Sequence, residues 1–245
     1  MDHIEIPSNL LEKLRNAKHV AVLTGAGISA ESKIPTFRDA QTGLWARYRP
    51  EELATPEAFI ANPKLVWDWY QWRRTLVSDA RPNPGHEALV AMQDHFPQFT
   101  LITQNVDSLH QRAGSRDVVE LHGNISRIKC FNGCGVIEEW EDSEKTPPEC
   151  PKCGGMLRPD VVWFGEALPE EAMLKAADAA VNSDVFFSIG TSALVYPAAG
   201  YVIQASRHGA FTVEVNIQVT AQSRELSCVI EGPSGRVLPK LLEQL

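Results

Sequence analysis

The sequence has little positive charge, no long apolar run and few cysteines. Its 245 residues include 23 Lys and Arg against 31 Asp and Glu, which gives a formal net charge of −8. A protein that holds the nucleic-acid backbone needs a basic face, so we expect no nucleic-acid partner. No stretch approaches the roughly 20 apolar residues that cross a bilayer, so we expect no membrane partner either.

The N-terminal residues also lack a targeting pattern. MDHIEIPSNLLEKL has neither the basic-then-apolar order of a secretory signal nor the Arg-rich, acid-poor character of a transit peptide. We therefore expect a cytoplasmic protein and a monomer. The hydrophobic content of 44% is enough for one substantial core and a smaller appended module.

Four of the five cysteines form two closely spaced pairs. Three residues separate Cys130 from Cys134, two separate Cys150 from Cys153, and fifteen lie between the pairs. In a reducing compartment this spacing predicts a closed tetrahedral zinc site, which is structural because no position remains for a reactive water. A nucleic-acid-binding zinc ribbon is the alternative, but residues 138–144 (EEWEDSE) make the segment acidic. Cys228 lies in a separate apolar run and is explained by a buried strand.

Apolar segments that predict strands alternate with segments that predict helices. The predicted strands are 19–23, 99–103, 118–122, 185–190 and 211–216, and the predicted helices include 10–17, 63–78, 86–96, 170–181 and 198–208. This order predicts an α/β fold with a Rossmann-like parallel sheet covered by helices on both faces. Residues 1–33, 78–124 and 159–245 would form this discontinuous domain. Two insertions would form a small lobe: a helical one at residues 34–77 and a zinc ribbon at residues 125–158.

A glycine-rich loop follows the first predicted strand. In GAGISA, Gly25 suits the turn, Gly27 a close approach of backbone to pyrophosphate, and Ala30 helix packing. A simple strand-to-helix turn explains the same residues. No acidic residue ends a second strand about 20 residues later, so a bound NAD would be held differently than in a dehydrogenase.

Polar residues follow two further strands. Gln104, Asn105 and Asp107 suit a carboxamide and ribose hydroxyls, although a capped turn is an alternative reading. His122 is a candidate general base, because its ordinary pKa of about 6.5 suits proton transfer near neutral pH. A hydrogen-bonded histidine at a strand end is the simpler explanation.

The helix at 63–78 carries Tyr70 and Arg73 three residues apart, on one face. The pair could hold an anion, or the two side chains could reach water from a core helix. Arg74 points elsewhere and is expected to be solvated.

Taken in order, the motifs resemble those of a known family. GAGISAESKIPTFR, TQNVDSLHQRAG, ELHG, the four-cysteine insertion, RPDVVWFGE, GTSALVYPA and VEVN are similar to the motifs of the sirtuins, NAD-dependent protein-lysine deacylases. The resemblance covers nearly the whole chain. Lys33 and Ser108 depart from it, because glycine is usual at both positions.

The resemblance implies a reaction and its residues. The acyl-lysine oxygen attacks C1′ of the nicotinamide ribose, nicotinamide leaves, His122 acts as base through the ribose hydroxyls, and water then releases lysine and O-acyl-ADP-ribose. NAD and one structural zinc ion are the implied cofactors, and acyl-lysine proteins or peptides, bound as an added strand, are the implied partners. The implied NAD-binding residues are Gly25, Ala26, Gly27, Ala30, Phe37, Arg38, Gln104, Asn105, Asp107, Gly190, Thr191, Ser192, Asn216 and Ser234. Those for the substrate backbone are Val162, Phe164, Gly165 and Glu166.

One sirtuin branch, class III, carries a Tyr-x-x-Arg pair and a small residue that widens the acyl pocket. Tyr70, Arg73 and Ala54 match these features. The resemblance therefore implies removal of succinyl and malonyl groups, with glutaryl as a further candidate and weaker deacetylase activity. The alternatives are a plain deacetylase with a structural Tyr–Arg pair, a protein ADP-ribosyltransferase, and a zinc-ribbon binding module without catalysis.

Overall fold

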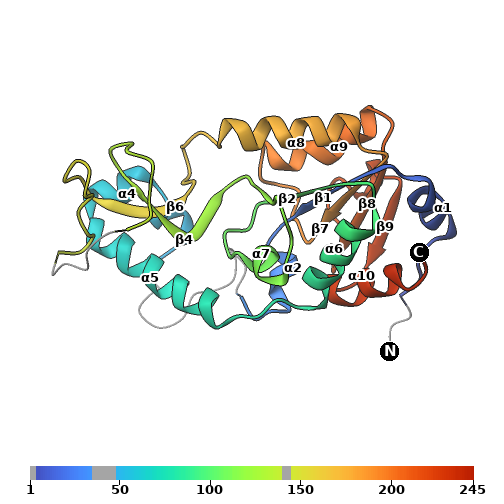
Figure 1. Ribbon diagram of the computed structural model, residues 1–245, viewed down its shortest axis with the longest axis horizontal. Helices are drawn as coiled ribbons and strands as arrows, with labels where there is room; N and C mark the ends of the chain where they lie inside the picture. The colour runs from blue at the N-terminus through green and yellow to red at the C-terminus, as the bar shows by residue number, and fades with distance from the viewer. Residues whose placement is uncertain (1–3, 35–47, 140–144) are drawn as a thin grey trace.

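The computed structural model describes residues 4–34, 48–139 and 145–245. A large lobe and a small lobe lie side by side along its longest axis (Figure 1). The sheet of the large lobe has six parallel strands in the order β3-β2-β1-β7-β8-β9. Their bounds are β1 His19–Thr24, β2 Gln98–Thr103, β3 Val119–Glu120, β7 Val185–Ile189, β8 Phe211–Asn216 and β9 Cys228–Glu231.

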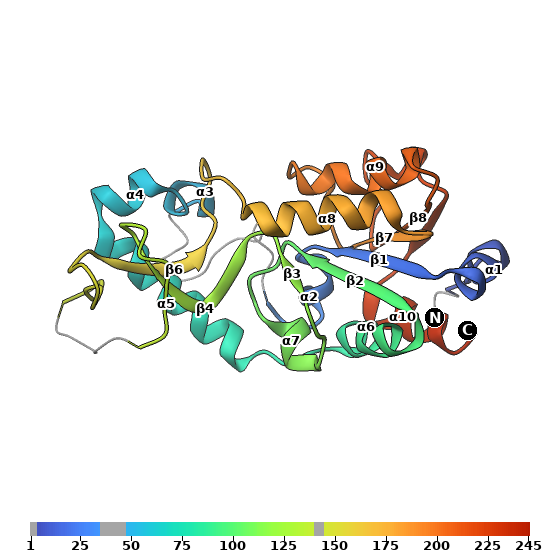
Figure 2. The same ribbon diagram turned by 45° about the horizontal axis from the view of Figure 1, so that its top comes forward.

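Helices cover both faces of this sheet, as the sequence predicts (Figures 1 and 2). Helices α1 (Ser8–Asn16), α6 (Pro84–His95) and α10 (Ser234–Leu242) cover one face, and α8 (Glu170–Asn182) and α9 (Tyr201–Arg207) cover the other. Successive side chains of β1 alternate between them: Val20 and Val22 join one core cluster, and Ala21 joins the other. No helix among the described residues is long and apolar enough to cross a membrane.

The small lobe combines an antiparallel sheet with helices. Its sheet has the order β5-β4-β6, with β4 Gly123–Cys130, β5 Val136–Ile137 and β6 Leu157–Val161. Its helices are α3 (Pro50–Leu53), α4 (Pro56–Ala61) and α5 (Pro63–Asp79). Phe59, Trp69 and Tyr70 from the helices pack in one core with Ile125 and Trp163. The two insertions therefore fold on each other.

The predicted strand 118–122 is wrong in its length. Strand β3 contains two residues, and His122 lies in the connection between β3 and β4. The backbone N–H of Leu121 still donates to the Thr103 carbonyl at 2.9 Å, after which the chain leaves the large sheet. Gly123 has a φ of +76°, and a Cβ there would lie 2.2 Å from the Asp160 carbonyl oxygen. This crossing places His122 where the two lobes meet.

Candidate functional site

The glycine loop after β1 packs backbone to backbone on the end of β7. The N–H of Gly25 donates to the Ile189 carbonyl at 2.9 Å, and that of Gly27 donates to the Gly190 carbonyl at 2.8 Å. Gly190 has a φ of +60°, and a Cβ on it would lie 2.5 Å from the backbone nitrogen of Ile28. A larger residue would therefore push the two loops apart.

The predicted packing role of Ala30 is wrong. The short helix α2 (Gly27–Ala30) ends at this residue, and the Ala30 side chain is exposed. Close packing between the loop and the sheet comes from the contact of Gly27 with Gly190. Phe37 and Arg38, which are also predicted to bind NAD, lie outside the described residues.

The loop after β2 is tied to the glycine loop. Asn105 donates its side-chain N–H to the Gly25 carbonyl at 3.0 Å, and the Ser29 hydroxyl donates to the Asp107 carboxylate at 2.7 Å. Burial raises the pKa of Asp107, against the hydrogen bond from Ser29. Ser29 is not among the residues predicted for the site, although its position in the first turn after the glycines is a usable signal. The structure thus brings Asn105 and Asp107 against the predicted NAD loop.

His122 has a defined tautomer. Its Nδ1 lies 2.9 Å from the Gln104 carbonyl oxygen, which can only accept a hydrogen bond. The proton therefore sits on Nδ1, and Nε2 keeps the lone pair that a general base needs. Burial lowers the pKa of His122, and the bond to Gln104 partly opposes this. The ring is neutral at physiological pH.

Four of the residues predicted to bind NAD lie at the ends of β7 and β8: Gly190, Thr191, Ser192 and Asn216. Asn216 donates its side-chain N–H to the Thr191 carbonyl at 2.7 Å, which joins the two strand ends, and Ser192 is exposed beside them. Ser234 is buried at the start of α10, and its hydroxyl donates to the Glu31 carboxylate at 3.3 Å. It therefore contacts the segment that follows the glycine loop.

The two departures from the sirtuin pattern share a backbone conformation. Lys33 has a φ of +63° and Ser108 a φ of +60°. This left-handed region favours glycine, because other residues bring Cβ close to the backbone. This backbone conformation explains why glycine is usual at these two positions in the family. Neither departure removes a group that contacts the site.

In the small lobe, Tyr70 is buried and Arg73, three residues later on α5, is half-buried. Tyr70 is 3% exposed, and its hydroxyl oxygen accepts a hydrogen bond from the Trp163 indole N–H at 2.9 Å. Burial raises the pKa of Tyr70 to about 12 and lowers that of Arg73. The Arg73 guanidinium carbon lies 5.1 Å from the ring centroid of Trp69. The phenol therefore stays protonated at physiological pH, and an arginine side chain keeps its charge in a protein.

The prediction that Arg74 is solvated is wrong. Its Nε–H donates to the Ile125 carbonyl at 2.7 Å, and its guanidinium carbon lies 5.4 Å from the ring centroid of Trp67. Burial lowers the pKa of Arg74 to about 10. Arg74 therefore links α5 to β4, because its side chain, next to Arg73 on the helix, points toward the small sheet.

The segment after β6 connects His122 with Ala54. The N–H of Val162 donates to the His122 carbonyl, and that of Phe164 donates to the Ala54 carbonyl, both at 2.9 Å. Ala54 is buried, whereas Phe164 and Gly165 are exposed. Glu166 is half-buried and forms an ion pair with Arg158. The structure thus brings the predicted base, the small residue and the predicted peptide-binding segment together.

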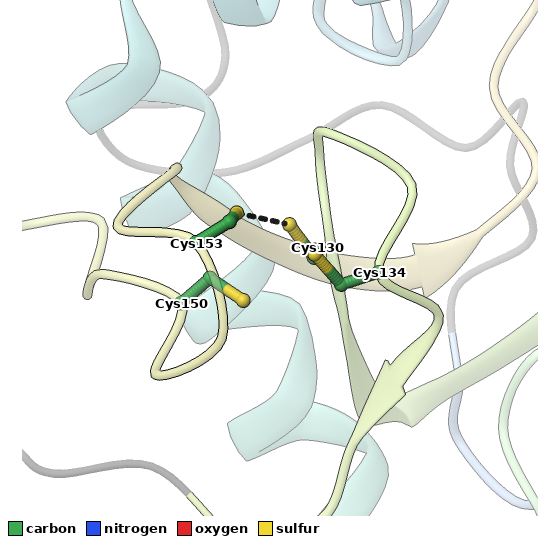
Figure 3. A group of neighbouring side chains, drawn as sticks. All are labelled: Cys130, Cys134, Cys150 and Cys153. Carbon is green, nitrogen blue, oxygen red and sulfur yellow. Dashed lines mark hydrogen bonds between the residues drawn. The ribbon is translucent and has the colours of Figure 1, made fainter.

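The four paired cysteines converge in the small lobe, and their side chains point toward one another (Figure 3). Their sulfur atoms all lie within 4.8 Å of one another, with Cys130 and Cys153 at 3.5 Å, and none of the four forms a disulfide. Zinc–sulfur bonds of about 2.3 Å place tetrahedral sulfurs about 3.8 Å apart, which fits this cluster. The residues are therefore positioned to bind a zinc ion, while Cys228 lies elsewhere, in β9.

Comparison with known proteins assigns the family. A model of the Sir2 family matches residues 25–197. The chain belongs to the Sir2 family. This sirtuin is 51% identical over 238 residues to NAD-dependent protein deacylase 2 of Pyrobaculum aerophilum, covering 97% of this chain and 95% of that protein. It is 48% identical over 243 residues to NAD-dependent protein deacylase 1 of Pseudomonas aeruginosa, covering 96% and 97%.

Solved structures agree with this assignment. The crystal structure of a Sir2 homologue–NAD complex superposes on the sirtuin with a TM-score of 0.90 at 42% identity, covering 99% of this chain and 95% of that one. A complex of Sir2 with p53 peptide and NAD⁺ has a TM-score of 0.86 at 28% identity, covering 98% of both chains. The α/β fold predicted from the sequence is therefore the Sir2 fold.

Proposed function

We propose that this sirtuin removes acyl groups from protein lysines with NAD, and that it prefers acyl groups that end in a carboxylate. Family membership and relatives named NAD-dependent protein deacylases support the first part. The observation that carries the second is that the buried Tyr70 shares a core cluster with the buried Ala54, with the half-buried Arg73 three residues from Tyr70 on the same helix.

Residues at the carboxyl ends of the large sheet would hold NAD. The glycine loop at Gly25 would approach the pyrophosphate, Gln104, Asn105 and Asp107 would surround the nicotinamide and its ribose, and the ends of β7 and β8 would hold the adenosine. When bound, NAD supplies the C1′ carbon at which the acyl oxygen displaces nicotinamide. His122 would accept a proton at Nε2 from the ribose hydroxyls, while the Gln104 carbonyl fixes its ring.

The segment 162–166 would bind the substrate backbone. The N–H groups of Val162 and Phe164 are already donated within the chain, so an added strand would pair with the remaining backbone groups of this segment. Gly165, with a φ of +86°, and Phe164 are exposed there. Backbone pairing of this kind recognises a peptide with little demand on its sequence.

Cytoplasmic location and a monomeric state stay predictions.

The acyl preference follows from desolvation. A guanidinium and a protonated phenol withdrawn from water can each donate to a terminal carboxylate, whereas an acetyl methyl offers them no partner. Hydrogen bonds to charged groups contribute about 1.5–3 kcal/mol each, which corresponds to roughly a 10- to 100-fold preference for a carboxylate held by Arg73.

Arg73→Met tests this proposal, and Arg74→Met is its matched control on the same helix. We expect Arg73→Met to lower kcat/KM for a succinyl-lysine peptide roughly 10- to 100-fold more than for the acetyl peptide. Arg74→Met should destabilise the small lobe, because it removes the bond to Ile125, and leave the succinyl-to-acetyl ratio unchanged. An Arg73→Met enzyme with the wild-type ratio would contradict the carboxylate clamp and leave Arg73 with a structural role only.

A further inference from the structure

Trp163 connects the predicted acyl clamp with the predicted peptide-binding segment. Its indole N–H donates to the Tyr70 hydroxyl at 2.9 Å, and its side chain is 1% exposed. In sequence it lies between Val162 and Phe164. A single residue thus contacts the phenol of the clamp and belongs to the segment proposed to bind the substrate backbone.

The Trp163 indole is held on one face by a buried arginine. The guanidinium carbon of Arg158 lies 3.2 Å from the ring centroid of Trp163, and Arg158 is 3% exposed. Arg158 in turn donates to the Val161 carbonyl at 2.7 Å and to the Glu166 carboxylate at 3.0 Å. Glu166 also accepts the Trp163 backbone N–H at 2.8 Å. A desolvated cation on an indole face is a strong contact, so the ring has little freedom to turn.

The hydrogen bond between Trp163 and Tyr70 has a fixed direction. An indole N–H can only donate, so the phenol oxygen must accept. The phenol proton is therefore not used in this contact, and among residues 4–34, 48–139 and 145–245 the structure shows no acceptor for it. A buried donor without an acceptor is unfavourable, and an anionic group that enters the site would relieve this cost.

We propose that Trp163 is a positioning residue for acyl specificity: by occupying the Tyr70 hydroxyl oxygen as acceptor, it directs the phenol proton toward the substrate's terminal carboxylate. This inference rests on the proposed preference for acidic acyl groups. The high pKa of Tyr70 keeps the phenol protonated, as the inference requires. Without the indole N–H, the phenol O–H could turn and donate its hydrogen bond to another acceptor.

The test is a double-mutant cycle of Trp163→Phe and Tyr70→Phe, read as the ratio of kcat/KM for succinyl and acetyl peptides. Loss of one oriented hydrogen bond should lower this ratio roughly 2- to 10-fold in Trp163→Phe. In the Tyr70→Phe background, Trp163→Phe should lower it no further, because the hydroxyl through which it acts is gone. Trp67→Phe, which removes another buried indole of the small lobe, should leave the ratio at the wild-type value.

A shape-conserving variant covers the case in which Trp163→Phe does not fold. A benzothienyl analogue of tryptophan at position 163 keeps the bicyclic ring and replaces the N–H by sulfur, and it should lower the ratio to the same extent. An unchanged ratio, or equal losses with and without the Tyr70 hydroxyl, would overturn the role of Trp163 while leaving the acyl preference in place. A wild-type enzyme with no succinyl preference would overturn both proposals.

Discussion

Replacing Cys153 by serine should loosen the small lobe without direct damage to its core. Cys153 is exposed, whereas Cys130 and Cys150 are buried in a cluster with Trp67 and Leu157. A loss of stability in Cys153→Ser therefore reports on metal binding and not on lost packing. Cys228→Ser is the matched control, since Cys228 is a buried cysteine of the large lobe and far in sequence from the cluster.

The size of the effect follows from the closed thiolate site. Structural zinc contributes about 10–16 kcal/mol to the folding of zinc-finger peptides, so one of four ligands corresponds to on the order of 3 kcal/mol. In a chain of this length, 1 kcal/mol shifts Tm by about 2–4 °C. We therefore expect Cys153→Ser to lower Tm by roughly 6–12 °C and to bind zinc less tightly.

Zinc content by mass spectrometry and hydrogen exchange along the chain measure this outcome. Exchange should rise in β4, β5 and β6, while β1 and β7 stay protected, because the two lobes have separate core clusters. Cys228→Ser should retain one zinc per chain. A Cys153→Ser protein with reduced zinc but wild-type exchange in β4 to β6 would refute a structural role of the metal.

Two further predictions concern histidines. His122→Ala should abolish deacylation while zinc content and Tm stay at their wild-type values. Because burial lowers the pKa of His122, the acid limb of the wild-type kcat/KM profile should lie below pH 6.5. Retained turnover in His122→Ala, or an acid limb above pH 6.5, would show that His122 is not the base. Burial also lowers the pKa of His86 to about 4 and of His110 to about 3, so the unfolded chain binds protons below pH 6.5 that the folded chain does not. Stability present above pH 6.5 should therefore be lost as the pH falls toward 4, by on the order of 1 kcal/mol per pH unit for each ring. Urea unfolding that is flat from pH 7 to pH 5 would contradict this.

The large lobe could be predicted from the sequence because its signals are local. Strands β1, β2, β7 and β8 are apolar runs between turn residues, and parallel strands bring their carboxyl ends to one edge. The glycine loop, Asn105, His122 and Asn216 could be placed near that edge before the structure was known. The cysteine spacing likewise predicted the cluster, because the chemistry of zinc demands four ligands within a few ångströms.

Contacts between the insertions could not be predicted in this way. Trp163 follows β6, and Tyr70 lies on α5, 93 residues earlier, so no periodicity relates them. The burial of Arg74 has the same origin, since its partner Ile125 belongs to β4. The two-residue length of β3 depends on where the chain leaves the sheet for the small lobe. Each of these features arises from tertiary packing, which overrides the local pattern.

The central claim is best tested by one comparison on the wild-type enzyme. A single lysine peptide carrying a succinyl, malonyl, glutaryl or acetyl group would be assayed with and without NAD, following nicotinamide and O-acyl-ADP-ribose by mass spectrometry. We predict NAD-dependent products from all four peptides, with a higher kcat/KM for the three acidic groups than for acetyl. Acetyl as the best substrate would contradict the acyl preference, and no NAD-dependent product from any peptide would contradict the deacylase itself.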